Sequence, residues 1–467
     1  MDETVRSPRD DSAERSFEGS VHNRGEDPID APVDDPVDDP GDGRGDDAGG
    51  ITRSGLAGTR RTALARYVIA ATLARTADGG AVVAIVLLVT TTGGPGWLGG
   101  LLAACLTAPH LAGPFIARPL DTARDGRKVI SAACLGHGAT LAAAVLLYPM
   151  VHPAVCALLL AASGLLGPLL TGGISSRLPA IAGPGQRDQR RAQGWDVATY
   201  GIGGTIGPSV VAAVTAWSSA TTAALVLAAA TVVAAALVML LPADRVKPTS
   251  AATPQPAATL GLMLRHGPLR RTLYLTMAVS ASVSVLPVTA VASTGALGVG
   301  HAAAGVLTSA YGIGGLAASG VLMVRPLAGD ADRSTTVLAV AVAGGLVAVL
   351  VSGVFGVAVA TYALAGALNS LFFAATLAAR SEYAPVQARG QVFVWIGALK
   401  ITAGSAGTAT AGALVAASVA LPLLIGVGLS SVAALASALE RHGMHRRRSG
   451  TAAARATSAP ARVQRRE

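Results

Sequence analysis

The sequence predicts an all-α membrane protein whose twelve transmembrane helices form two halves of six. Three observations carry this prediction. The 467-residue chain is 51% hydrophobic and 13% charged, with a mean hydropathy of +0.53, whereas soluble globular chains contain about 25% charged residues. Apolar runs of about 20 residues, long enough to cross a bilayer as a helix, recur along the chain. The breaks between these runs are alternately basic and free of Lys and Arg.

The first 60 residues are expected to form a disordered acidic tail. They include the run APVDDPVDDPGDGRGDD, and the segment from Asp2 to Asp47 is rich in Asp, Glu, Gly and Pro. Such a segment cannot bury enough apolar surface to offset the entropy lost on ordering. It also contains no apolar stretch of the kind found in a signal peptide. The first membrane helix is therefore expected to direct insertion.

The expected spans follow one another with short breaks. They are placed at residues 66–90, 97–117, 129–149, 154–175, 196–217, 220–241, 271–292, 302–324, 334–354, 357–379, 391–414 and 418–438. The longest break, at 242–270, is polar and Pro-rich and divides the spans six and six. We therefore expect a first half at 61–241, a linker at 242–270, a second half at 271–440 and a basic disordered tail at 441–467.

The charge of the breaks predicts the orientation. The basic breaks hold Arg118 to Lys128, Arg187 to Arg191, Arg245 to Arg271, Arg325 with Arg333, and Arg380 with Arg389. The positive-inside rule then places both termini and the linker in the cytoplasm. Arg greatly outnumbers Lys, as in GC-rich bacterial genomes, so a bacterial plasma membrane is the expected location. The Arg-rich C-terminal tail is expected to contact anionic lipid headgroups.

Two segments of the first half contain sequence motifs, and a separate three-residue sequence of the first half recurs in the second half. The loop after the second span holds, in order, Gly113, Asp121, Gly126, Arg127 and Lys128. The fifth span holds GWDVATYGIGGTIGP, in which Gly194, Gly203, Gly207 and Pro208 have the spacing G-x8-G-x3-G-P. Glycines at such spacings let another helix approach closely. Arg118-Pro119-Leu120, after the second span, recurs as Arg325-Pro326-Leu327 after the eighth, which indicates parallel repeats.

These residues resemble motifs A and C of the major facilitator superfamily, and the resemblance covers about residues 62–440. It implies two six-helix halves that rock around a central site, and a gating role for Asp121, Arg127 and Lys128. Because motif C marks antiporters that are mostly exporters, it also implies export of a small molecule by proton antiport. The chain departs from the family at Thr122, where a basic residue is usual, and at Val211 and Ala212, which replace two glycines.

Several other classes of function are disfavoured. No Walker P-loop occurs, which argues against an ATP-driven pump, and no His cluster, paired carboxylates or nucleophile motif suggests an enzyme. The arginines lie between apolar runs, so nucleic acid is not an expected partner. No cofactor or metal is expected. The partners are then a small-molecule substrate, protons and lipids, and the alternatives are uptake of a metabolite by symport or a non-transporting sensor or scaffold.

Asp78 is the strongest candidate for a proton carrier, because an ionisable side chain at membrane depth is costly unless it is paired or hydrated. Arg75 lies three residues earlier and so on the same helix face. It is expected to modulate the proton affinity of Asp78 or to bind an anionic group of the substrate. The alternative is a structural ion pair between the two residues.

Lys400 lies within the eleventh span without an acid nearby, so it either faces a cavity or extends outward to the membrane surface. His110 and Asn369 are further candidates for the pathway, and His137 ranks below them, since buried polar side chains more often serve packing. Two acids are expected to be structural. Asp196 would cap the start of the fifth span, and Glu382 would pair with Arg380 in a loop.

Overall fold

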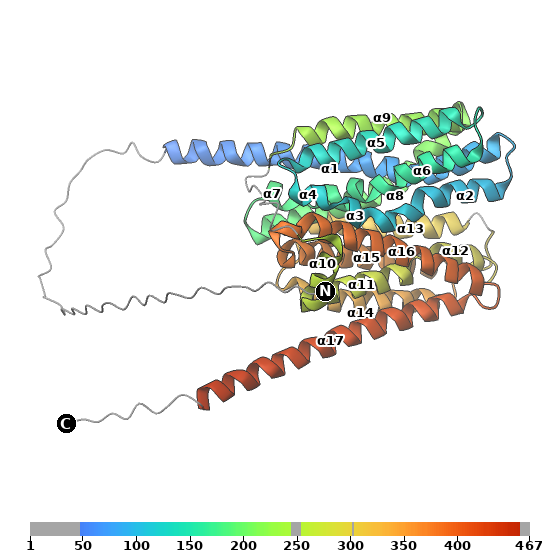
Figure 1. Ribbon diagram of the computed structural model, residues 1–467. Coiled ribbons are helices and arrows are strands. Elements are labelled where there is room, and N and C mark those ends of the chain that lie inside the picture. The colour runs from blue at the N-terminus through green and yellow to red at the C-terminus, as the bar shows by residue number, and fades with distance from the viewer. Residues whose placement is uncertain (1–46, 244–253, 301–302, 458–467) are drawn as a thin grey trace, which may run out of the picture. The chain divides into compact units, whose positions relative to one another are not determined.

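The computed structural model describes residues 47–243, 254–300 and 303–457. The chain divides into two units, Met1–Arg53 and Ser54–Glu467, and the helices that pack together belong to the second (Figure 1). Within the described residues, twelve helical segments are long and apolar enough to cross a membrane. The predicted all-α class and number of spans are confirmed.

The first half contains six spans built from eleven helical elements. They are α1 (Asp47–Thr91), α2 (Gly96–Thr107), η1 (Ala108–Ala112), α3 (Gly113–Ile116), α4 (Arg118–Thr122), α5 (Gly126–Leu147), α6 (Pro153–Pro168), η2 (Leu169–Gly173), α7 (Leu178–Ala182), α8 (Gln186–Trp217) and α9 (Ala220–Met239). Proline divides two of the spans. Pro109 lies at the start of η1, and Pro168 ends α6 where the backbone passes into the π-helical turn η2.

The second half contains the remaining six spans. They follow the linker helix α10 (Pro256–Arg265) and are built from α11 (Gly267–Val283), α12 (Leu286–Ser293), α13 (Ala303–Val324), α14 (Ala331–Leu350), α15 (Phe355–Tyr383), η4 (Val386–Ala388), α16 (Arg389–Leu414) and α17 (Ala420–Thr457). A buried ion pair joins α11 to α14, with Arg271 Nη2 2.8 Å from Asp332 Oδ2. Glu440 of α17 lies 2.8 Å from Arg271 Nη1, so the pair also holds the last span.

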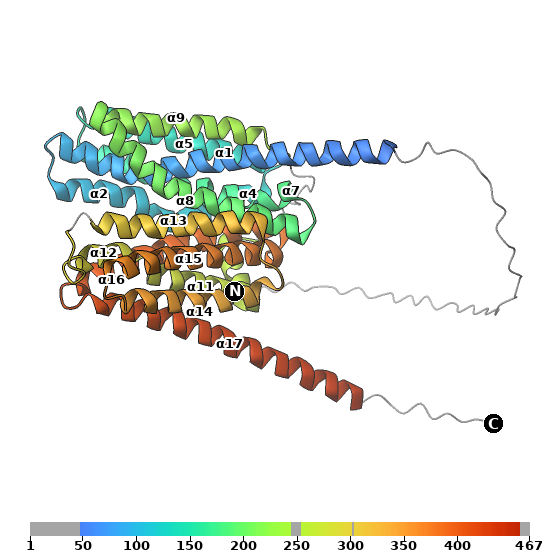
Figure 2. The ribbon, with the colours of Figure 1, turned by 180° about the vertical axis from the view of Figure 1, so that it is seen from behind.

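Small residues fill the interior of each half. The buried apolar clusters of the first half are dominated by Ala and Leu from α1, α5, α6 and α9, and the second half has its own clusters around α11, α13, α14 and α15. Alanine and glycine let helix backbones approach closely where no water drives association. The two halves meet along α8 and α13, which lie side by side in Figure 2, and also along α16 and η2.

The predicted tails and linker differ from the structure in their helical content. Helix α1 begins at Asp47, inside the segment expected to be disordered, and α17 continues to Thr457. The linker at 242–270 contains α10, whose Met263 is buried and whose Pro256 carbonyl accepts a hydrogen bond from Trp395 Nε1 at 3.1 Å. Residues 1–46, 244–253 and 458–467 of these predicted segments lie outside the described residues.

Candidate functional site between the two halves

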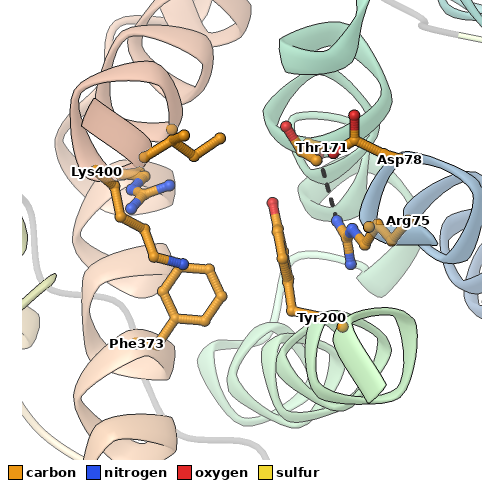
Figure 3. Close-up of a pocket in the computed structure, with 11 residues that line it drawn as sticks. Arg75, Asp78, Thr171, Tyr200, Phe373 and Lys400 are labelled. Carbon is orange, nitrogen blue, oxygen red and sulfur yellow. Dashed lines mark hydrogen bonds between the residues drawn. The ribbon is translucent and has the colours of Figure 1, made fainter. Parts of the chain in front are cut away.

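A cavity of about 170 Å³ lies between the halves. Its first-half wall comes from α1, η2 and α8, and its second-half wall comes from α15 and α16. The lining side chains that carry charge or polarity are Arg75, Asp78, Thr171, Tyr200, Arg380 and Lys400. In Figure 3, Lys400 and Phe373 face Tyr200, Arg75 and Asp78 across this space. Three of the predicted pathway residues, Arg75, Asp78 and Lys400, therefore lie together.

Arg75 is paired with Asp196 rather than with Asp78. The guanidinium Nη1 lies 2.7 Å from Asp196 Oδ1, and both side chains are buried. Asp196 lies in the interior of α8, which begins ten residues earlier at Gln186, so the predicted capping role is wrong. The carboxylate instead neutralises an arginine of the neighbouring helix, as intramembrane charges commonly do.

The Arg75–Asp196 pair is fixed by further contacts. The Tyr67 hydroxyl donates to Asp196 Oδ1 at 2.6 Å, and the Ser175 hydroxyl donates to Asp196 Oδ2 at 2.8 Å. Ser175 also accepts from Arg75 Nη2 at 2.8 Å, and the Tyr200 ring centre lies 3.5 Å from the guanidinium carbon. These partners hold Arg75 against the cavity wall.

Asp78 is placed beside His110. Asp78 Oδ1 lies 3.5 Å from His110 Nε2, and the two side chains are 17% and 6% exposed. The two side chains can lie this close together because residue 167 of α6 is a glycine. A Cβ at Gly167 would lie 2.3 Å from His110 Nε2 and 2.9 Å from Asp78 Oδ1. Two candidates that are 32 residues apart in the sequence thus form one acid–imidazole pair at the edge of the cavity.

Arg380 is a cavity residue that the sequence analysis placed in a loop. It is 1% exposed and lies inside α15, three residues before the helix ends at Tyr383. The predicted Arg380–Glu382 pair is wrong, since Glu382 Oε1 lies 2.7 Å from Arg190 Nη2. The predicted span ends with the apolar run at residue 379, whereas the helix continues to Tyr383 and so includes Arg380. A span predicted to continue one turn past the apolar run would have included this arginine.

Lys400 and Arg380 lie over the same aromatic ring. Lys400 Nζ is 4.0 Å from the ring centre of Phe373, and the guanidinium carbon of Arg380 is 5.7 Å from it. Lys400 Nζ also lies 5.4 Å from the Tyr200 ring centre. Among the residues that the structure describes, neither cation has a carboxylate within ion-pair distance. Of the two positions expected for Lys400, the structure has the one that faces the cavity.

The other predicted pathway residues pack away from the cavity. Asn369 Nδ2 donates to the Tyr311 hydroxyl at 2.8 Å and so joins α15 to α13. His137 is fully buried, and its Nδ1 lies 3.0 Å from the Ser163 hydroxyl of α6. Neither residue lines the cavity. Both side chains therefore have hydrogen-bond partners on neighbouring helices, as most buried polar groups do, although the second ring nitrogen of His137, Nε2, has none among the described residues.

The predicted gating residues lie at one end of the halves, which we call the basic end and define by the loops 123–125, 183–185, 325–330 and 384–388. Asp121 accepts hydrogen bonds from the backbone N–H groups of Gly390 and Gln391, both at 2.8 Å. These groups begin α16 of the other half, where a carboxylate is favoured by the helix dipole. Arg190 adds a second contact between the halves through Glu382. The halves are therefore joined at the basic end.

Arg127 and Lys128 lie on the first half, beside this junction. Arg127 Nη2 lies 2.8 Å from Asp125 Oδ2, and Arg127 Nη1 donates to the Leu241 carbonyl at 2.6 Å. The hydrogen bonds from Arg127 hold the pKa of Asp125, which lies outside the spans, below its usual range. Lys128 is exposed. These two residues belong to the surface of the first half.

The fifth-span glycines bring α8 close to two other helices. A Cβ at Gly203 would lie 2.7 Å from Arg75 Cβ, and one at Gly207 would lie 2.5 Å from the Thr76 carbonyl oxygen. A Cβ at Gly194 would lie 2.9 Å from Leu322 Cβ of α13, in the other half. Helix α8 continues through Pro208. Gly203 and Gly207 thus bring α1 near enough for Arg75 to reach Asp196.

Comparisons with known proteins agree with this architecture. The family model described as Major Facilitator Superfamily matches residues 67–400. A bacterial homologue of the iron transporter ferroportin, solved in an outward-facing state, has a TM-score of 0.65 at 11% identity, covering 81% of this chain and 99% of that one. The fucose:proton symporter of E. coli has a TM-score of 0.62 at 13% identity, covering 82% and 99%.

The human organic anion transporter MFSD10 has a TM-score of 0.61 at 13% identity, covering 81% of this chain and 99% of that one. At these identities the solved structures share the fold alone. A search of curated proteins found no match.

Proposed function

The chain belongs to the major facilitator superfamily, and on this basis we propose that it exports a small molecule through the cavity between its halves in exchange for protons. As a member of that family it is a multi-pass secondary transporter and not an enzyme. The observation that carries the proton coupling is the Asp78–His110 pair at the cavity edge. A non-transporting sensor or scaffold would not need such a pair.

The pair provides a proton site whose affinity depends on helix position. Asp78 belongs to α1 and His110 belongs to η1, so a small shift between these elements changes the 3.5 Å separation. A carboxylate beside a protonated imidazole favours its charged form, whereas an isolated carboxylate in the membrane interior favours its neutral form. Separation of the two side chains would therefore load a proton onto Asp78, and their approach would release it.

Helix α8 supports export as the direction. Its Gly203 and Gly207 pack directly on the α1 segment that carries Arg75 and Asp78, so movement of α8 is transmitted to the proton site. The resemblance of this segment to motif C is the sequence feature that favours antiport. The plasma membrane with both termini in the cytoplasm remains the proposed location and orientation.

A second candidate is uptake by proton symport, and the charge of the cavity favours it. Arg380 and Lys400 face the cavity without a counter-charge among the described residues. Arg75 is neutralised by Asp196, and Asp78 is the carboxylate that lines the cavity. Protonation of Asp78 would remove a negative charge and so strengthen the binding of an anion. By linkage, the anion would in turn strengthen the binding of the proton, and mutual strengthening of this kind favours transport of the two in the same direction.

Proteoliposomes that enclose a pH-sensitive dye test the proposal. We expect a panel of organic acids, phosphate, sugars and amines to contain a compound whose movement is accompanied by protons. Protons that move opposite to the compound support antiport, and protons that move with it support symport.

The same proteoliposomes test the role of Asp78. Asp78→Asn should bind and exchange the compound but move no protons. Undiminished proton movement in Asp78→Asn would eliminate Asp78 as the coupling residue and direct attention to His110 and Lys400.

A further inference from the structure

Two cations of the cavity have no anionic partner in the described part of the chain. Arg380 is 1% exposed, its Nε has no hydrogen-bond partner, and its Nη2 has only a long contact of 3.4 Å with the Thr376 hydroxyl. Lys400 contacts the rings of Phe373 and Tyr200. Asp196 is already bound by Arg75, Tyr67 and Ser175, and Asp78 lies beside His110.

Aromatic contacts alone compensate these charges poorly. The face of a ring attracts a cation, but a ring cannot replace the water or the counter-ion that a buried ammonium or guanidinium loses. Arg380 and Lys400 also repel each other, because both lie over the Phe373 ring. An arrangement of this kind is stabilised when an anion enters.

We propose that the cavity binds a small anion, with a carboxylate or phosphate group held between Arg380 of α15 and Lys400 of α16. Guanidinium presents paired N–H donors to either group, and an ammonium adds a point charge. The remaining part of the ligand would lie against Tyr200, Phe373 and Ile401, which also line the cavity. With a volume of about 170 Å³, the cavity admits a ligand of metabolite size.

The substrate class deepens the proposed transport function and rests on it, because an anion in this cavity is the cargo only if the protein is a transporter. Arg75 differs from Arg380 and Lys400, the residues proposed to bind the anion, because Asp196 neutralises its charge. Arg75 would therefore form part of the cavity wall without supplying the charge that attracts the anion. Figure 3 shows Tyr200 standing between Arg75 and Lys400, so the neutralised and the free cation lie on opposite sides of one ring.

The test is thermal unfolding of the full chain in detergent at constant pH and ionic strength. Inorganic phosphate and succinate serve as the two anion probes, and choline and mannitol serve as cationic and neutral controls. We expect one anion to raise the Tm by at least about 2 °C, and which of the two does so identifies phosphate or carboxylate. Choline and mannitol should have no effect.

Variants separate the proposed site from general charge effects. Lys400→Gln and Arg380→Gln should each lose the anion-dependent shift. Lys400→Arg should keep it, and so should Arg325→Gln, which removes one charge from an exposed position outside the cavity. Because one of two repelling cations is gone, Lys400→Gln should also have a Tm without anion that equals or exceeds that of the wild type.

No anion-specific shift in the wild type, or a shift that persists in both Lys400→Gln and Arg380→Gln, would overturn the anion site. If Arg380→Gln does not fold, Lys400→Gln decides the question alone. The measurement uses no gradient. Anion binding without proton movement would therefore refute coupling and keep the site, whereas coupled transport without anion binding would refute the site and keep the function.

Discussion

At the scale of single residues, Arg75 and Asp78 show how one helix face can serve two different partners. Both side chains reach the cavity (Figure 3). Arg75 is nevertheless bound by Asp196 of α8, and Asp78 lies beside His110 of η1. The first contact joins two full charges in a buried setting, and the second joins a carboxylate to a group that can lose its charge. The Arg75 contact is therefore suited to a fixed scaffold, and the Asp78 contact to proton exchange.

Replacing Asp196 should destabilise the protein strongly. Asp196→Asn leaves the buried Arg75 without its counter-charge, and an orphaned buried charge costs about 3–5 kcal/mol. Asp188→Asn, an exposed acid in the first turn of the same helix, is the matched control and should leave the Tm unchanged. The double variant Arg75→Gln with Asp196→Asn should recover part of the loss, since no charge is then left unpaired. Equal Tm values for the two single variants would refute the structural role of the pair.

Sequence analysis found Asp78, Arg75 and Lys400 because charges stand out in apolar runs. It could not find the partners, since Asp196 is 121 residues from Arg75 and only packing brings them together. The capping role predicted for Asp196 was wrong because the start of its helix was predicted too late in the sequence. The apolar run of the fifth span begins at residue 196, but α8 begins at Gln186, and its first turns contain Arg190 and Gln193, which are buried among other helices.

At the scale of elements, close helix contacts rest on individual glycines. Hydropathy predicts that a span exists, because any apolar run of sufficient length must leave water. It does not predict how near two spans come. Gly167 sets the separation of α6 from the Asp78–His110 pair, and no motif in the sequence marks it.

A methyl group at Gly167 should disturb the proton site. In Gly167→Ala the added carbon would lie 2.3 Å from His110 Nε2 and 2.9 Å from Asp78 Oδ1, so the two side chains must leave their present positions. We expect a loss of stability of about 1–3 kcal/mol and impaired proton movement in proteoliposomes. Gly100→Ala on α2, where a Cβ meets no atom within 4 Å, should keep both properties. Normal proton movement in Gly167→Ala would show that the pair tolerates displacement.

At the scale of the whole molecule, the two halves meet around the cavity and are fastened at the basic end. Asp121 of the first half accepts hydrogen bonds from the backbone of Gly390 and Gln391 in the second half. Glu382 of the second half forms an ion pair with Arg190 of the first half. The break at 242–270 predicts a division into halves of six spans each. The contact of Asp121 with a helix terminus was not predictable, because its partners are backbone groups 269 and 270 residues away.

Weakening this junction should open the basic end. Asp121→Asn removes the charge and turns one acceptor into a donor, so at least one of the two backbone hydrogen bonds is lost, at a cost of about 1–3 kcal/mol. Spin labels at the exposed positions Arg124 and Gln387, in a chain whose three free cysteines are replaced, would measure the separation of the halves. We expect a longer distance population in Asp121→Asn and an unchanged distribution in the control Asp188→Asn. Identical distributions would mean that Asp121 does not hold the halves together.

The orientation of the whole molecule can be tested by labelling. A cysteine at the exposed Ser218, between α8 and α9, should react with an impermeant thiol reagent added outside the cell. A cysteine at Thr253, which lies outside the described residues, should react only after permeabilisation. The reverse pattern would place the termini on the outer side.

The Asp121 junction has a consequence for tolerance to mutation. Gln391 contributes more than its backbone N–H, because its buried side chain accepts a hydrogen bond from the Thr259 hydroxyl and donates one to the Pro254 carbonyl, both at 3.1 Å. Gly390 is constrained for a different reason, since a Cβ there would lie 2.8 Å from Asp121 Oδ1. A saturation screen for activity should therefore tolerate few substitutions at 121, 390 and 391, with 390 limited by space and 391 by the hydrogen bonds of its side chain.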